Sequence, residues 1–214
     1  MIFLKSESHF HFVEITNSTN LLLNEIVTKN KNEGINLPDF FCVSANYQTA
    51  GKGQGVKNWQ SNKGENILAS FYFQPLISPP QQLYFNYFFA LTVWKVLSQY
   101  VHNVMIKKPN DIYVGDKKMV GILIEHHIQG DKLTYSVAGV GINVNQTQFD
   151  SALPNPTSLK LITGKDYDRK QILEEIVQVG AFYYNKLQNG AFMELENEYE
   201  SYIYKNVKIE EKTD

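Results

Sequence analysis

The stretch KKPNDIYVGDKKMVGILIE, residues 107–125, decides how the middle of this chain folds. Pro109 has no backbone N–H to donate, so it ends the short apolar strand that precedes it. Residues 111–114 resume as a strand, and the Gly-Asp pair at residues 115–116 supplies the turn into a second strand over residues 118–128. The stretch therefore predicts a β-hairpin.

Further strand patterns lie on both sides of this hairpin. Residues 40–45 are β-branched and aromatic, and residues 66–73 place alternate apolar side chains on one face. A long glycine-rich loop, residues 46–63, joins these two segments. Residues 134–145 form another apolar strand, interrupted by two glycines where a ligand can approach the backbone.

Three segments have helical patterns. Ser18 can cap a helix through its hydroxyl, and apolar residues then recur at helical spacing to about residue 30. Residues 83–101 have the pattern of a mostly buried helix that packs on a sheet. Asp168 and Gln171 have capping-box spacing and predict the start of a long C-terminal helix.

Composition limits the classes of protein. A chain of 214 residues fits one large domain, or one domain with a small appendage. Its net charge of -2 gives no overall attraction to DNA or to an acidic membrane. Cys42 lies in an apolar run and fits a core position in a reducing cytoplasm. Residues 1–12 show no secretory signal, and the apolar region 84–97 is shorter than the ~20 residues of a membrane span.

The loop sequence QTAGKGQGVKNW, residues 48–59, alternates glycine with polar residues. Glycine-rich backbone can present N–H groups to an anion, and Lys52 adds a full charge, which suits a phosphate or an activated carboxylate. The loop fits neither the Walker pattern nor the dinucleotide pattern. Taken alone, it is better explained as a glycine-rich surface loop without a ligand.

Polar residues also stand at the entrance of the hairpin. Asn110 and Asp111 follow a proline, so an amide and a carboxylate are held where they can bind a ribose, an amine, or a phosphate through Mg²⁺. Lys118 enters an apolar strand. Taken alone, such a lysine is usually one that extends to the rim of the sheet.

Together these segments resemble the biotin protein ligase family. Residues 107–125 resemble its Lys-Trp-Pro-Asn-Asp…Lys…Gly-Ile-Leu-Glu signature, and residues 48–59 resemble its Gly-Arg-Gly-Arg…Trp biotinyl-adenylate loop. Ser-Thr-Asn at residues 18–20 and Gly-Val-Gly-Ile-Asn at residues 139–143 stand at two further landmarks, in the family's order. The resemblance covers about residues 13–187. It implies an α+β fold, a mixed β-sheet with helices packed mainly on one face.

The resemblance also implies an activity. Biotin would be activated with ATP to biotinyl-5'-AMP and then transferred to a specific lysine of a biotin carboxyl carrier protein. ATP, Mg²⁺ and biotin are the expected small molecules, the carrier protein is the expected acceptor, and a homodimer is one form that relatives adopt. A carboxylate is a poor acyl donor, so it first attacks the α-phosphate, and nearby positive charge offsets the charge that develops there.

Roles for individual residues follow from the same resemblance. Lys118 and Lys52 are the expected catalytic residues, and Asp111 is the expected Mg²⁺ ligand. The residues expected to bind biotin are Ser18, Thr19, Asn20, Gln48, Gly51, Lys52, Gly53, Gln54, Lys118, Gly121, Gly139 and Gly141. Those expected around the nucleotide are Lys52, Gln54, Trp59, Asn110, Asp111 and Asn143.

The resemblance divides the chain in two. Residues 1–190 correspond to the catalytic domain, and residues 191–214 to a C-terminal helix with a remnant or the start of a small SH3-like domain. The chain starts at the catalytic region, so the winged-helix DNA-binding domain of repressor-type relatives is not expected. A cytoplasmic protein without DNA or membrane partners is the expectation.

Two alternatives stand beside the biotin ligase interpretation. Lipoate protein ligases have a related fold, but the Gly-Lys-Gly-Gln loop and Pro-Asn-Asp favour the biotin enzymes. Gln54 and Lys108 depart from the family's second loop arginine and its tryptophan, which affects affinity. A catalytically idle binder is favoured if Gln54 and the short C-terminus abolish turnover. Retention of Lys52 and Lys118 argues against the idle binder.

Overall fold

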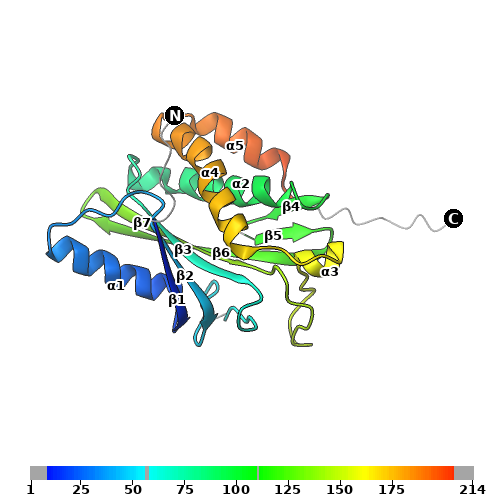
Figure 1. Ribbon diagram of the computed structural model, residues 1–214. Helices are drawn as coiled ribbons and strands as arrows, with labels where there is room; N and C mark the ends of the chain where they lie inside the picture. The colour runs from blue at the N-terminus through cyan, green and yellow to red at the C-terminus, as the bar shows by residue number, and fades with distance from the viewer. Residues whose placement is uncertain (1–8, 56–57, 110, 205–214) are drawn as a thin grey trace.

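A seven-stranded sheet forms the centre of the molecule in the computed structural model (Figure 1), which describes residues 9–55, 58–109 and 111–204. The strand order is β1-β2-β3-β7-β6-β5-β4, and only β1 and β2 run parallel. The sheet is therefore mixed, as expected. The strands are β1 (Phe10–Thr16), β2 (Cys42–Gln48), β3 (Ile67–Phe73), β4 (Val104–Lys107), β5 (Asp111–Val114), β6 (Lys117–Gln129) and β7 (Lys132–Ile142).

The predicted hairpin is confirmed as β5 and β6. Gly115 turns the chain with φ of 59°, a left-handed conformation that glycine adopts without steric cost. Gly130, with φ of 63°, makes the corresponding turn between β6 and β7. Two glycine turns in succession place β5, β6 and β7 side by side.

Helices cover both faces of the sheet unequally. Figure 1 shows α2, α4 and α5 on one side and α1 on the other. The prediction of helices packed mainly on one face is confirmed. The helices are α1 (Thr19–Asn32), α2 (Gln82–Leu97), α3 (Leu159–Thr163), α4 (Arg169–Gln188) and α5 (Phe192–Ser201), with a 3-10 turn η2 (Pro79–Gln81) before α2.

Strand β3, an inner strand of the sheet, is buried along its whole length because side chains pack against both of its faces. Ile67, Ala69, Phe71 and Phe73 face the large core shared with α2 and α4, as the alternating pattern predicts. On the opposite face, Tyr72 packs in a smaller cluster with residues of α1. Helix α1 is therefore anchored to the middle of the sheet.

The helix-capping predictions are right about position and wrong about some bonds. Ser18 has the extended backbone of an N-cap, but its hydroxyl makes no capping hydrogen bond. Gln48 of β2 reaches the first turn instead, where its Oε1 accepts from the backbone N of Thr19 at 2.7 Å. Asp168 caps α4 through Lys170 N at 2.8 Å, whereas Gln171 bonds forward along the helix and completes no capping box.

The end of the described chain packs into the same core. Tyr199 of α5 stacks on Tyr87 of α2 at 4.2 Å between ring centroids. Residues 202–204 then run along β4, where Ile106 N donates to Tyr202 O at 2.8 Å. The domain boundary at residue 190 stays a prediction. Within the described ranges, no helix combines the length and apolarity that crossing a bilayer requires.

Candidate active site

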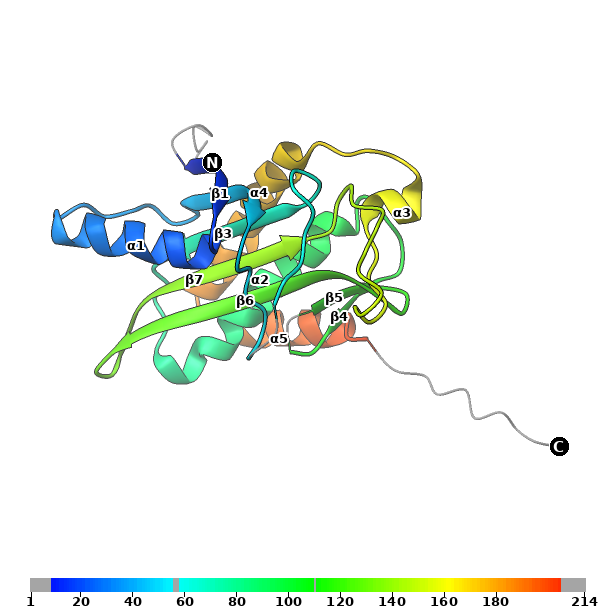
Figure 2. The same ribbon diagram turned by 90° about the horizontal axis from the view of Figure 1, so that it is seen from below.

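A pocket of about 430 Å³ opens on the face of the sheet that carries α1. Figure 2 shows the loop between β2 and β3 crossing over β7 and β6. Residues of this loop, among them Lys52 and Trp59, line one side of the pocket. The pocket brings together residues that the family resemblance implies for biotin and residues that it implies for the nucleotide. Its lining includes Ser18, Thr19, Asn20, Gln48, Lys52, Gly53, Gln54, Trp59, Asp111, Lys118, Gly121, Gly139, Gly141 and Asn143.

The two remaining predicted residues have different outcomes. Gly51 is buried in the same loop, where a Cβ would lie 2.7 Å from Trp59 O and 2.9 Å from Gln48 Nε2. Its small size therefore lets the two ends of the loop close on one another. Asn110 lies outside the described residues. The roles assigned to all these residues stay predictions.

An ion pair lies at one end of the pocket. Lys118 Nζ is 2.7 Å from Asp111 Oδ2, and the two side chains are 30% and 27% exposed. The backbone of Lys118 is held on the other side, since its N donates to Asn155 O at 2.8 Å and its O accepts from Thr157 N at 2.9 Å. Lys118 therefore lines the pocket with its ammonium group paired to Asp111.

Glycines form the floor of the pocket. A Cβ on Gly141 would lie 2.4 Å from Trp59 Cε2, and one on Gly121 would lie 2.8 Å from Trp59 Cζ3. A Cβ on Gly139 would lie 2.3 Å from Asn20 Oδ1. As predicted, other groups come close to the backbone at these glycines. In this structure those groups are the Trp59 ring and the Asn20 amide. Trp59 Nε1 is buried and has no hydrogen-bond acceptor within the described part of the chain.

Hydrogen bonds organise the other end of the pocket. Gln48 Oε1 accepts from both Thr19 N at 2.7 Å and Thr19 Oγ1 at 3.0 Å. Ser70 Oγ lies 2.7 Å from Thr19 Oγ1 and 2.5 Å from Asn20 Oδ1. The sequence patterns did not indicate Ser70. The available signal was a small hydroxyl residue in the middle of a wholly buried strand, since buried polar groups need hydrogen bonds.

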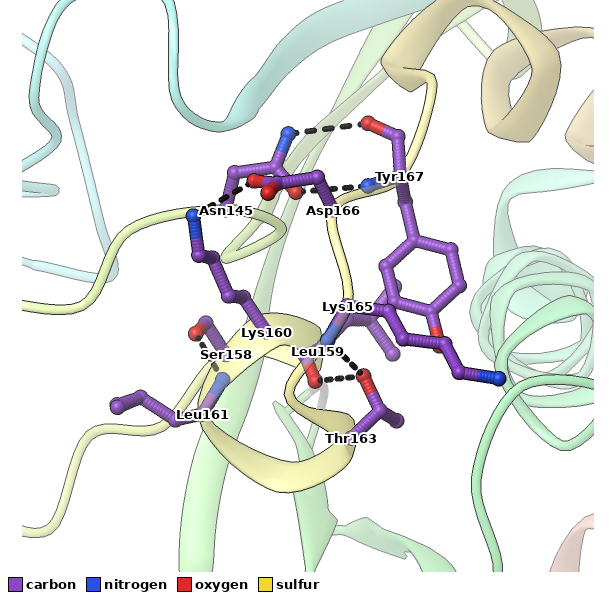
Figure 3. Close-up of polar contacts among 9 residues, drawn as sticks. All are labelled: Asn145, Ser158, Leu159, Lys160, Leu161, Thr163, Lys165, Asp166 and Tyr167. Carbon is purple, nitrogen blue, oxygen red and sulfur yellow. Dashed lines mark hydrogen bonds and ion pairs between the residues drawn. The ribbon is translucent and has the colours of Figure 1, made fainter.

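The segment of residues 146–157, after β7, makes an apolar wall that the sequence patterns did not indicate. Figure 3 shows how its ends are fixed: Asn145 forms two hydrogen bonds with the backbone of Tyr167, each 3.0 Å long. Ser158 Oγ accepts from Leu161 N at 3.1 Å and so caps α3. The residues of this segment that line the pocket are Phe149, Leu153, Pro154 and Pro156.

Asn143 belongs to a buried amide network behind this wall. Its Nδ2 donates to Thr157 O at 3.0 Å, and its Oδ1 accepts from Asn66 Nδ2 at 3.4 Å. Asn66, which is fully buried, also donates to Gln146 Oε1 at 2.6 Å and accepts from Val144 N at 2.9 Å. The Asn143 amide therefore supports the wall beside Lys118 in this structure.

Two polar residues of the glycine-rich loop, Lys52 and Gln54, line the pocket and are exposed. Lys52 forms a short antiparallel bridge with Asn58. Across the described ranges, His, Cys, Asp and Glu side chains form no group of three or more that could hold a metal ion. A single carboxylate such as Asp111 fits Mg²⁺ that arrives with a nucleotide, because that ion keeps waters and phosphate oxygens as most of its ligands.

A glycine-floored pocket with an amide end and a lysine end, set on a mixed sheet, defines a ligand-binding α+β domain suited to an anionic small molecule. The chain belongs to the biotin/lipoate A/B protein ligase family, whose family model matches residues 12–143.

The curated relatives include repressor-type proteins. The chain is 30% identical over 206 residues to the bifunctional ligase/repressor BirA of Bacillus spizizenii, a match that covers 93% of this chain and 62% of BirA. The Bacillus subtilis BirA is 29% identical over the same shares. The biotin--protein ligase of Schizosaccharomyces pombe is 33% identical over 125 residues, which cover 49% of this chain and 20% of the relative. The chain thus spans less than two thirds of the length of these relatives.

Solved structures share the fold. The biotin protein ligase from Aquifex aeolicus in complex with biotin and ATP has a TM-score of 0.75 and 26% identity, with 91% of this chain and 78% of that chain covered. The Leishmania major biotin protein ligase in complex with biotin has a TM-score of 0.75 at 20% identity, covering 96% and 85%. The second similarity is one of fold alone.

Proposed function

We propose that this protein activates biotin with ATP to give biotinyl-5'-AMP and transfers biotin to a lysine of a biotin carboxyl carrier protein. The observation that carries the proposal is Lys118, held inside the pocket by Asp111 at 2.7 Å, in a chain that belongs to the biotin/lipoate ligase family. A lysine at that point can meet both a carboxylate and the phosphate that it attacks.

In the first step, an oxygen of the biotin carboxylate forms a bond to the α-phosphorus of ATP. The bond from that phosphorus to the bridging oxygen breaks, and pyrophosphate leaves with the electron pair. Lys118 offsets the negative charge that develops on the phosphoryl oxygens, and Lys52 adds a second charge from the loop. Mg²⁺, when bound with ATP, supplies further charge neutralisation, and Asp111 is the residue that would hold it.

In the second step, the neutral amine of the acceptor lysine attacks the acyl carbon of the mixed anhydride. The acyl carbon–oxygen bond breaks, AMP leaves, and the amine loses a proton as the amide forms. A mixed anhydride survives only where water is kept away from it. The glycine loop and the wall of residues 146–157 lie on either side of the pocket and can exclude water from it.

The remaining assignments belong to the same proposal. The biotin rings would lie toward Ser18, Thr19, Asn20 and Gln48, and the nucleotide toward Lys52, Gln54, Trp59, Asn110 and Asn143. The floor glycines, with Gly51 and Gly53, would shape the space for biotin. A cytoplasmic location, a homodimeric form, no DNA partner and a division of the chain at residue 190 complete the proposal.

Biotin-dependent exchange of labelled pyrophosphate into ATP tests the first step. We expect exchange with biotin, little with lipoate, and a fall of about a hundredfold or more in Lys118→Ala. Lys117→Ala is the matched control, because Lys117 is exposed and lies next to Lys118 in the chain. Absence of exchange with either acid would overturn the ligase proposal. Biotin binding measured by calorimetry in that case would support the idle binder.

A further inference from the structure

Ser70 lies in the middle of β3, directly below the amide end of the pocket. All seven residues of β3 are buried, and Ser70 has no exposed surface. Its hydroxyl contacts two consecutive residues of α1, at 2.7 Å from Thr19 Oγ1 and 2.5 Å from Asn20 Oδ1. One buried hydroxyl therefore links β3 to two residues that line the pocket.

The supply of protons fixes the direction of each hydrogen bond in this cluster. Thr19 Oγ1 donates its single proton to Gln48 Oε1 at 3.0 Å, so it can only accept from Ser70. Asn20 Nδ2 donates to Leu123 O at 3.4 Å, which turns the acceptor Oδ1 toward Ser70. Ser70 thus places its single proton between two acceptors, which share it.

The same hydrogen-bond directions determine whether the oxygen or the nitrogen of the Gln48 side-chain amide faces away from Thr19. Its Oε1 already accepts from the backbone N and the hydroxyl of Thr19, at 2.7 and 3.0 Å. Its amide nitrogen is consequently turned to the side of Gly51, where a Cβ would lie 2.9 Å from Gln48 Nε2. In this arrangement Gln48 offers a donor, and not an acceptor, toward its free side.

We propose that Ser70 is a positioning residue for the ring end of the bound acid. By sharing its one proton between Thr19 and Asn20, Ser70 leaves the Thr19 proton on Gln48 and so favours one orientation of the Gln48 amide. Without the Ser70 hydroxyl, Thr19 Oγ1 and Asn20 Oδ1 are two facing acceptors with no donor, which is unfavourable in a buried place. Thr19 relieves this by turning its proton toward Asn20, and Gln48 is then held only by its bond to the backbone N of Thr19. That the acid is biotin rests on the proposed function.

Two measurements on the full chain test this role, one without any ligand. Amide hydrogen exchange at Thr19 measures how stable the hydrogen bond from Thr19 N to Gln48 is. Calorimetric titration measures the affinity of the protein for biotin. We expect Ser70→Ala to speed exchange at Thr19 about tenfold and to weaken biotin binding about tenfold, with ATP affinity within about twofold of wild type. Ser70→Cys, a weak donor of similar size, should fall between serine and alanine in both measurements.

Ser44→Ala is the matched control. Ser44 is a buried serine of the adjacent strand β2, and its hydroxyl donates to Leu68 O at 3.2 Å, away from the lining of the pocket. This variant should leave Thr19 exchange and biotin affinity unchanged. Wild-type values for both quantities in Ser70→Ala would overturn the positioning role. If wild type itself binds no biotin, the proposed function fails, and the exchange rate at Thr19 alone decides whether Ser70 orders Thr19 and Gln48.

Discussion

Lys118 and Asp111 lie on adjacent strands, β6 and β5, and form an ion pair with 2.7 Å between Nζ and Oδ2. Both side chains line the pocket. The pair holds the lysine in place before any ligand arrives, and it places a carboxylate where a metal-bound phosphate would enter.

Replacing the Asp111 carboxylate by an amide tests its part in metal binding. Asp111→Asn should raise the Mg²⁺ concentration for half-maximal pyrophosphate exchange about tenfold, because one anionic ligand is lost. Asp116→Asn, in the exposed hairpin turn, is the control and should leave the Mg²⁺ requirement unchanged. An Asp111→Asn enzyme with the wild-type Mg²⁺ requirement would rule out Asp111 as a ligand.

Gly141 provides the space in which the Trp59 ring lies. A methyl group there would come within 2.4 Å of Trp59 Cε2, so Gly141→Ala should displace the indole. The chain has two tryptophans, and Trp94 is mostly buried in the core. We expect the fluorescence emission of Gly141→Ala to shift to longer wavelength as Trp59 becomes exposed. The shift should be absent in the double variant Gly141→Ala/Trp59→Phe. A shift that persists in the double variant would come from Trp94 and would contradict this prediction.

How much of this site the sequence predicts depends on how local each contact is. The β5–β6 hairpin follows from neighbouring residues, Pro109 and Gly115, and was predicted with nearly correct bounds. The floor glycines were predicted to allow close approach, but the pattern could not show that Trp59 and Asn20 make that approach. Ser70 was missed because its contact with Thr19 joins residues 51 positions apart, which no local pattern reveals.

The wall of residues 146–157 was missed for a related reason. Its position depends on backbone bonds such as Thr157 N to Lys118 O, and on the two bonds between Asn145 and Tyr167. No regular strand or helix covers it, so hydrophobic periodicity gives no signal. The fold class and most of the pocket lining could be predicted, whereas the tertiary contacts that shape the pocket could not.

Asn66 should be important for stability, because its buried amide bonds with Val144, Gln146 and Asn143. Asn66→Ala leaves these buried groups without their bonds and should lower the free energy of unfolding by about 3 kcal/mol. Chemical denaturation measures this change. Asn66→Asp keeps the acceptor for Val144 N but turns a buried carboxylate toward Gln146 Oε1 and Asn143 Oδ1, so it should lose at least as much at neutral pH. Gln178→Ala, at an exposed position of α4, should be close to neutral.

Stability should also depend on two adjacent histidines. Burial lowers the pKa of His126 and of His127 below the ordinary value of 6.5. Because the unfolded chain takes up these protons first, their contribution to stability is complete above pH 6.5 and is lost as the pH falls below that value. The free energy of unfolding should therefore decrease between about pH 7.5 and about pH 5.5.

Two variants test whether His126 causes this pH dependence of the free energy of unfolding. His126→Gln should flatten the pH dependence, while His102→Gln, at an exposed position, should keep the wild-type slope. If His126→Gln and wild type lose the same stability over this range, groups other than His126 are responsible.

The glycine floor also limits how this pocket can be redesigned. At Gly121, Gly139 and Gly141 the strands offer no side chain to shorten, and in this structure the Trp59 ring and the Asn20 amide lie directly on them. A protein engineer who wants to admit a bulkier acid cannot deepen the cavity by trimming residues underneath it. New volume has to come from the sides, by shortening Phe149 or Leu153 in the segment after β7.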